Sequence, residues 1–239
     1  MRKLFTPRRA VQLLIVYLTC LMTITFAAQQ IGFPSECINN STTLSCALPG
    51  AAGKKIGPTV AILVWSMGKR DRDLPGSKPF ADFIAGEVAP WARSRYSILS
   101  GPKSVVAAGS SLGGYCATYC AFTHPEAIGN VISQSGSYWV SKNWQTVDAQ
   151  FHRRLYPRDT GAMIEEFKIS KRLPIRFYME VGVYEMGAAM LGSNREFRDV
   201  LQLKGYDVDY HEFAGGHSFV NWRGSLSDGL ISILCRKHD

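Results

Sequence analysis

The feature that most constrains the fold is a short turn, Gly109-Ser110-Ser111-Leu112-Gly113, between an apolar run at residues 104–108 and a helix-like segment. A G-x-S-x-G pattern placed between a strand and a helix is typical of the sharp turn that presents a nucleophilic serine. The flanking glycines are needed because a strand that reverses at once into a helix leaves no room for side chains around the serine. The turn therefore predicts strands that lead into helices, with Ser111 as the candidate nucleophile.

The rest of the chain fits this arrangement, because short apolar runs alternate with longer helix-like stretches from Thr59 onward. The expected strands are residues 59–65, 104–108, 130–134, 174–181 and 207–213. The expected helices are residues 80–95, 113–123, 193–204 and 222–235. We expect Ser193 to cap the third helix and Gly205 to end it. The alternation predicts an α/β fold of the α/β-hydrolase type, with a mostly parallel sheet and helices on both faces.

The beginning of the chain has a different character. Residues 1–9 carry four basic side chains and no acidic one, and residues 10–28 are nearly uncharged and apolar. This pattern is typical of a secretory signal peptide. An uncleaved membrane anchor is the alternative, since the apolar stretch approaches the roughly 20 residues that span a bilayer. Either interpretation predicts a periplasmic or secreted protein, with residues 29–57 as an irregular arm and residues 58–239 as one domain.

Charge and cysteine content exclude some classes of function. Loss of the leader would remove four positive charges and lower the net charge from +8 to +4, a mild excess. No run of Lys and Arg is interleaved with aromatic residues, so we expect no nucleic-acid partner, and membrane contact only through an uncleaved leader. Cys116 and Cys120 stand at helical spacing in an apolar run and are expected to be buried thiols, whereas Cys37 and Cys46 bracket a polar loop compatible with a disulfide. We expect no metal site and no cofactor.

A nucleophilic serine needs a general base, and the chain has five histidines. In hydrolases of this fold the order along the chain is serine, acid, histidine, with the histidine in a loop after the last strand. His217 meets this condition, because it follows the expected strand 207–213 through Ala214-Gly215-Gly216. His211, inside that strand, and His124, before a proline, are expected to be structural.

The acid of the triad should follow the strand at residues 174–181. Glu185 lies in the loop where a carboxylate would reach the histidine and fix its tautomer. Glu180 is the rival; next to the strand's end, it could face solvent or pair with a basic group. Asp207, Asp209 or a Ser–His pair without a carboxylate also stay open. The backbone amide of Leu112 is the expected oxyanion donor, because it follows the nucleophile at the start of a helix.

Several motifs between Val60 and Leu234 carry a resemblance to a known family. They are Phe80-Ala81-Asp82-Phe83 with Pro90-Trp91, Ala108-Gly109-Ser110-Ser111-Leu112-Gly113-Gly114, His124-Pro125-Glu126 with Gly129-Asn130-Val131, Ser133-Gln134-Ser135-Gly136-Ser137-Tyr138-Trp139, Asn194-Arg195 with Arg198-Asp199-Val200-Leu201, and Phe213-Ala214-Gly215-Gly216-His217 with Trp222-Arg223-Gly224. Through them the segment resembles the C-terminal catalytic domain of the enterochelin (enterobactin) esterase family, an esterase D-like domain. The motif matches carry the family's nucleophile onto Ser111 and its histidine onto His217.

The resemblance implies an exported serine esterase that hydrolyses carboxylic esters, with the trilactone of enterochelin-type siderophores as the expected substrate. The front of the chain departs from the family, because the first core strands and the Asp-Gly turn that supplies part of the oxyanion hole are not recognisable before residue 59. Loss of one oxyanion donor typically costs 10²–10³ in rate. A truncated, catalytically weak homologue that acts as a binding protein, or an acyltransferase, is therefore the alternative.

Substrate choice is predicted from charge. The segment 142–172, between two expected strands, carries seven basic and four acidic residues, a net charge of +3. A cap with this excess above Ser111 would favour an anionic substrate such as a ferric catecholate, with Arg153 and Arg154 stacking on catechol rings. Trp222 and Arg223, just past His217, could extend the same surface. The alternative is a solvated helix whose charges face water.

Overall fold

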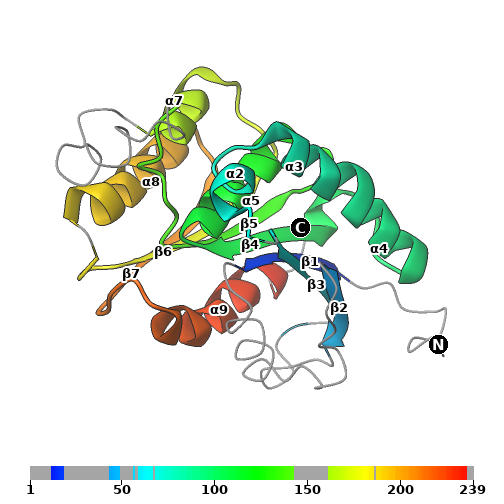
Figure 1. The fold of residues 1–239 in the computed structure, drawn as a ribbon. Coiled ribbons are helices and arrows are strands. Elements are labelled where there is room, and N and C mark those ends of the chain that lie inside the picture. Colours follow the sequence, from blue (N-terminus) through cyan, green and yellow to red (C-terminus); the bar gives the residue numbers. More distant parts are fainter. Residues whose placement is uncertain are drawn as a thin grey trace.

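The computed structural model describes residues 12–18, 43–48, 56, 59–66, 68–142, 161–185 and 187–235. Its centre is a seven-stranded sheet with the order β2-β3-β1-β4-β5-β6-β7 (Figure 1). The strands are β1 (Gln12–Leu18), β2 (Thr43–Leu48), β3 (Thr59–Trp65), β4 (Val105–Ser110), β5 (Asn130–Gln134), β6 (Arg176–Gly182) and β7 (Asp207–Phe213). All neighbouring pairs are parallel except β2 with β3, which is antiparallel.

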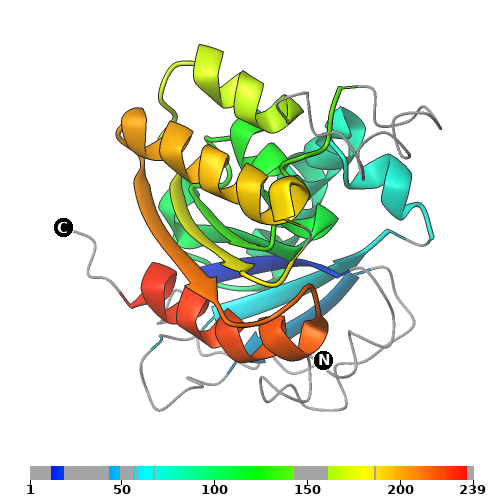
Figure 2. The ribbon, with the colours of Figure 1, turned by 90° about the vertical axis from the view of Figure 1, so that its left-hand side faces the viewer.

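Helices cover both faces of the sheet, and α9 (Phe219–Leu234) lies on the face opposite the others (Figure 2). The elements on the other face are α2 (Arg70–Asp73), α3 (Lys78–Phe83), η2 (Ile84–Val88), α4 (Ala89–Arg95), α5 (Leu112–Thr123), α7 (Ala162–Ile169), η4 (Ala188–Gly192) and α8 (Ser193–Leu203). A single turn, η3 (Pro102–Ser104), precedes β4.

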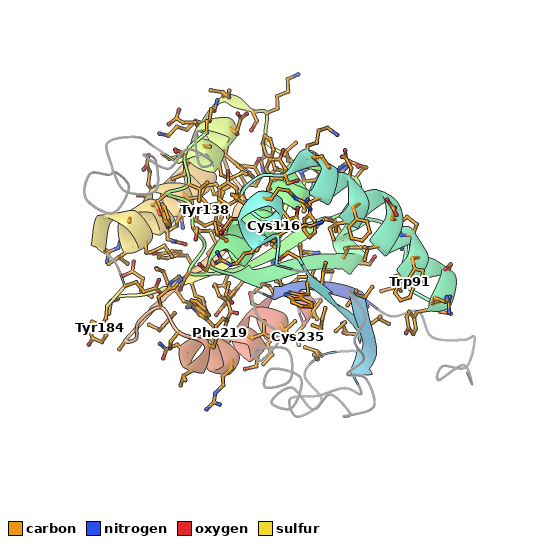
Figure 3. All side chains as sticks on the ribbon, viewed as in Figure 1. Trp91, Cys116, Tyr138, Tyr184, Phe219 and Cys235 are labelled. Carbon is orange, nitrogen blue, oxygen red and sulfur yellow. The ribbon has the colours of Figure 1, made fainter. Side chains whose placement is uncertain are left out.

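The central strands are apolar at nearly every position because both of their faces are covered. In β4, Val105 and Ala107 belong to the core beneath α5, whereas Val106 and Ala108 pack in the core beneath α9. The edge strand β7 is only partly covered, and it carries the acidic residues Asp207, Asp209 and Glu212. Cys116 and Cys120 are buried thiols on α5, as predicted, and Cys116 is labelled within the helical layer in Figure 3.

Most predicted elements are confirmed. The prediction of an irregular arm at residues 29–57 is wrong for residues 43–48, which form the edge strand β2. Three further differences are local. The helix predicted at 80–95 is instead α3, the π-helical turn η2 and α4 in succession. The last helix begins at Phe219, earlier than predicted. Ser193 does not cap a helix, because η4 runs directly into α8 and the Ser193 hydroxyl donates to the Ala189 carbonyl at 2.6 Å. Gly205 does follow the end of α8, with φ +74°.

The sheet has a central strand at the place where the sequence suggested that one was missing. Gln12–Leu18, from the segment interpreted as a leader or anchor, forms β1 and pairs with β3 on one side and β4 on the other. A continuous apolar run is equally typical of the apolar core of a leader and of a strand that is buried on both faces. The sequence pattern could therefore not distinguish a leader from a central strand. Cleavage of the leader, the anchor, the Cys37–Cys46 disulfide and the periplasmic or secreted location stay predictions; among the described residues, no helix is long and apolar enough to cross a membrane.

Deleting residues 1–28 is expected to abolish cooperative folding. Both β3 and β4 would lose the backbone hydrogen bonds that β1 makes to them, at the centre of the sheet. Thermal unfolding followed by circular dichroism measures this, with a deletion of residues 1–10, which leaves β1 intact, as the control. A chain without residues 1–28 that unfolds at the wild-type temperature would show that β1 is dispensable and would support the leader interpretation.

Candidate active site

Ser111 lies in a strained turn between β4 and α5. Its φ is +60° and its ψ is −125°, a backbone conformation that residues other than glycine rarely adopt. A Cβ atom at Gly109 would come within 2.4 Å of the Gly113 carbonyl, which explains why the pattern needs glycine there. The Ser111 amide donates to the Gln134 carbonyl at 2.9 Å, and the Ser137 amide donates to the Ser111 carbonyl at 3.1 Å. The turn is therefore anchored on the loop that follows β5.

Leu112 is the first residue of α5, and its backbone amide is one of those that have no acceptor within the helix. The positive end of the helix dipole lies at the same place. The structure thus puts an unsatisfied amide and a favourable field directly after Ser111, as an oxyanion donor requires.

His217 and Glu185 meet at the ends of two neighbouring strands, β6 and β7. The loop after β6 packs against the loop after β7, because the Tyr184 amide donates to the Gly215 carbonyl at 3.1 Å. His217 Nδ1 and Glu185 Oε2 lie 2.6 Å apart. Tyr184, next to Glu185, and Phe219, two residues after His217, are exposed beside this pair and are labelled in Figure 3.

The Glu185 side chain has no exposed surface, yet its carboxylate is well satisfied. Oε1 accepts hydrogen bonds from the Gly182 amide at 2.9 Å and from the Ser135 hydroxyl at 2.5 Å. Burial acts to raise the pKa of Glu185, but the hydrogen bonds from His217, Ser135 and Gly182 outweigh burial and hold this pKa below its ordinary value. Glu185 is therefore a carboxylate at neutral pH and can orient the imidazole.

Glu180 has a different environment and makes no hydrogen bond with His217. The prediction that it faces solvent or pairs with a basic group is wrong, because it is 1% exposed and lies among neutral donors. Gln134 Nε2 donates to its carboxyl at 2.8 Å and Tyr178 Oη at 3.0 Å, and the Ser225 hydroxyl also donates to it. Burial raises the pKa of Glu180. This carboxyl belongs to a buried polar cluster between β5, β6 and α9.

The other residues considered for the triad are engaged elsewhere. Asp209 lies 2.8 Å from His211, and Asp207 lies 3.0 Å from Arg176. His124 lies between Asp82, at 2.8 Å, and Glu126, at 3.1 Å. These contacts engage the other candidates, so that Glu185 is the candidate carboxylate that contacts His217.

Among the described residues, the Ser111 hydroxyl contacts Ser137 rather than His217, with 3.3 Å between the two Oγ atoms. Ser135 and Ser137 thus contact the acid and the nucleophile, respectively, from one loop after β5. Sequence reasoning included both serines in a family motif but gave neither a role. The motif was the only available signal, because the positive φ of Ser135 cannot be read from the sequence.

The predicted substrate-binding residues are placed only in part. Trp222 is 4% exposed, so the prediction that it extends a substrate surface is wrong; its indole ring packs edge-on against the His217 ring, with 4.7 Å between centroids. Arg223 is exposed on α9. Arg153 and Arg154 lie outside the described residues. Among the described residues, no group of three or more His, Cys, Asp or Glu side chains could hold a metal ion.

Comparison with known proteins agrees with this geometry. Residues 56–233 match the model of the family described as "Putative esterase". Over 170 residues the chain is 31% identical to the iron(III) enterobactin esterase of Dickeya dadantii, and over 184 residues it is 27% identical to that of Escherichia coli K12, covering 69% and 75% of this chain. The chain spans 37% and 42% of the length of these two curated relatives.

A solved structure shares the fold. The crystal structure of the enterobactin esterase of Shigella flexneri in the presence of enterobactin aligns with a TM-score of 0.72 and 22% identity, over 95% of this chain and 52% of that chain. The predicted α/β-hydrolase fold is confirmed. Because residues 56–233, which are most of this chain, match the family model, the chain belongs to this esterase family.

Proposed function

We propose that the chain is a serine esterase in which Ser111, His217 and Glu185 form the catalytic triad. The observation that carries this proposal is the 2.6 Å contact between His217 Nδ1 and the buried Glu185 carboxylate, on the same edge of the sheet as the strained Ser111 turn. Because Nδ1 faces Glu185, Nε2 is the ring nitrogen that can take the serine proton. No cofactor is needed for this chemistry.

The reaction would proceed through an acyl-enzyme. Ser111 Oγ bonds to the ester carbonyl carbon while its proton passes to His217 Nε2, and the Leu112 amide stabilises the oxyanion. The carbon–oxygen bond to the alcohol then breaks, and the alcohol leaves with the proton from His217. Water repeats the two steps, giving its proton to His217 and releasing the carboxylic acid and free Ser111.

For the substrate class we propose esters of catechol siderophores of the enterochelin type, including their ferric complexes. Two observations support this choice: curated relatives are named iron(III) enterobactin and iron(III) salmochelin esterases, and the segment 142–172 has a net charge of +3. In the described part of that segment, Lys142 pairs with Glu166, and Lys168 pairs with Glu165 and Glu196. The residues that we propose for anion binding are Arg153 and Arg154, which lie outside the described residues.

The alternative of a catalytically weak binding protein depended on a missing central strand. Since β1 occupies that position in the sheet, the main argument for this alternative is removed. An acyltransferase would use the same acyl-enzyme with an acceptor other than water, and the described residues provide no observation that favours it.

Ser111→Ala is expected to abolish ester hydrolysis with little change in stability, since the hydroxyl serves chemistry and alanine fits its space. His217→Ala should lower kcat by several orders of magnitude, to the residual catalysis of the oxyanion site and binding. Hydrolysis of p-nitrophenyl butyrate and labelling by a fluorophosphonate measure both effects, with His211→Ala as the matched control. Wild-type turnover in Ser111→Ala, or a larger loss in His211→Ala than in His217→Ala, would contradict the assignment.

Glu185→Gln is expected to lower kcat at neutral pH without unfolding the domain, because an amide cannot stabilise the charged imidazolium as a carboxylate does. Glu180→Gln is the matched control and should have a smaller effect on kcat, because Glu180 makes no hydrogen bond with His217. Initial rates and thermal unfolding of both variants test this. The opposite ranking would assign the acid to Glu180, and small effects in both would indicate a Ser–His dyad.

Replacing both Arg153 and Arg154 with Gln is expected to raise KM selectively for a ferric catecholate ester. The cause would be lost attraction to an anion, so the difference should shrink at high salt. KM for a neutral short-chain ester is the internal control. Equal changes for both substrates, or none for either, would show that the two arginines do not select the substrate.

A further inference from the structure

The turn after β5 contains a second strained serine. Among the described residues other than glycine, only Ser111 and Ser135 have a positive φ, +60° and +48°. Such residues persist where the surrounding contacts fix them, and they gather at functional sites. Ser111 has its explanation as the nucleophile, whereas Ser135 still needs one.

The contacts of the Ser135 hydroxyl determine the direction of its hydrogen bonds. Trp222 Nε1 lies 2.9 Å from Ser135 Oγ, and an indole N–H can only donate. Ser135 therefore accepts from Trp222 and must give its single proton to Glu185 Oε1, 2.5 Å away. The Ser135 amide donates to the Glu180 carbonyl at 2.7 Å, which fixes the backbone of the turn.

The backbone carbonyl and the indole of Trp222 are held by two consecutive residues, Gln134 at the end of β5 and Ser135 in the loop that follows. Gln134 Nε2 donates to its carbonyl at 2.7 Å, and Ser135 accepts from its indole. The ring lies edge-on to the His217 imidazole, with an interplanar angle of 88°. Because Trp222 is buried, this contact restricts the imidazole on one side and does not serve as an exposed surface.

We propose that Ser135 and Trp222 are positioning residues of the acid–base pair, a role that rests on the proposed esterase function. Ser135 fixes Glu185 Oε1, so that Oε2 is directed at His217 Nδ1. Trp222 orients Ser135 and forms a wall against the imidazole. One tryptophan thereby couples the orientation of the acid to that of the base.

The backbone of Ser135 offers an unusually clean test. Glycine adopts a φ of +48° without the steric penalty that a Cβ atom brings, so Ser135→Gly removes the hydroxyl and relieves strain in one change. Loss of activity in this variant then reflects the hydroxyl rather than a failure to fold. Tyr178→Phe is the matched control, because it removes one buried hydroxyl donor from Glu180, the neighbouring carboxyl outside the triad.

Two readouts are measured on the full-length protein. The first is kcat and KM for p-nitrophenyl butyrate, for which we expect kcat of Ser135→Gly to fall on the order of 10-fold with KM unchanged. The second is the pKa of Glu185 from the carboxyl resonance in ¹³C-glutamate-labelled protein, assigned with Glu185→Gln. This pKa should rise in Ser135→Gly, because a hydrogen bond that lowers it is lost, and should stay at the wild-type value in Tyr178→Phe.

Trp222→Phe is the second variant, and it keeps an aromatic ring beside His217 while removing the N–H donor to Ser135. We expect a smaller fall in kcat than in Ser135→Gly, again with KM unchanged. The positioning proposal is overturned if Ser135→Gly keeps either the wild-type kcat or the wild-type pKa of Glu185. It is also overturned if kcat falls equally in Tyr178→Phe while the pKa of Glu185 does not move.

The NMR measurement separates this proposal from the proposed function. If the wild-type protein hydrolyses no ester and is not labelled by a fluorophosphonate, the esterase proposal fails. A rise in the pKa of Glu185 in Ser135→Gly would even then establish the bond between Ser135 and Glu185. An unchanged pKa in an active wild-type enzyme would refute the positioning role and leave the esterase function intact.

Discussion

The parallel pairing of β4, β5, β6 and β7 is the constraint on which the whole site depends. Ser110 of β4 lies opposite Gln134 of β5, Gln134 opposite Glu180 of β6, and Glu180 opposite His211 of β7. Parallel strands in this register end at the same edge of the sheet, so the loops that follow them meet there. Ser111, the two serines after β5, Glu185 and His217 are in this way gathered from distant parts of the chain.

Within this edge, two carboxyls five positions apart have opposite environments. Glu180 points into a cluster of neutral donors beneath α9, and burial raises its pKa. Glu185 lies in the loop beyond the strand, where an imidazole, a hydroxyl and an amide stabilise the charged form. The two pKa values are shifted in opposite directions, which fits different roles: Glu180 contributes to the contact between sheet and helix, and Glu185 is the proposed acid of the triad.

Close backbone contact between loops is what allows the acid to reach the base. A Cβ atom at Gly182 would lie 2.3 Å from the Gly215 carbonyl and 3.0 Å from Glu185 Oε1. Glycine at this position lets the loop after β7 approach the loop after β6, and the Gly182 amide can then bind Glu185 directly. Gly182, the last residue of β6, and Gly215, two residues before His217, are therefore part of the same contact.

The sequence by itself determined those strands and turns that follow from the order and type of neighbouring residues. Continuous apolar runs predicted the strands from Thr59 onward, because strands covered on both faces need apolar residues on both. The elbow around Ser111 was predictable because its steric demand for glycine is local. The order of the chain indicated His217 as the base and left Glu185 and Glu180 as candidate acids.

Only the tertiary structure decided what depends on contacts between distant segments. The apolar run 12–18 suits a leader and a central strand equally, and only its pairing with β3 and β4 makes it β1. Contacts with residues far away in the chain distinguish Glu185, which binds His217, from Glu180, which binds Gln134. Such contacts also show that Trp222 lies in the interior, bound to Ser135, and not on a substrate surface. The physical reason is that burial, hydrogen-bond partners and pKa are properties of the assembled surroundings, whereas periodicity and turn sterics are properties of neighbouring residues.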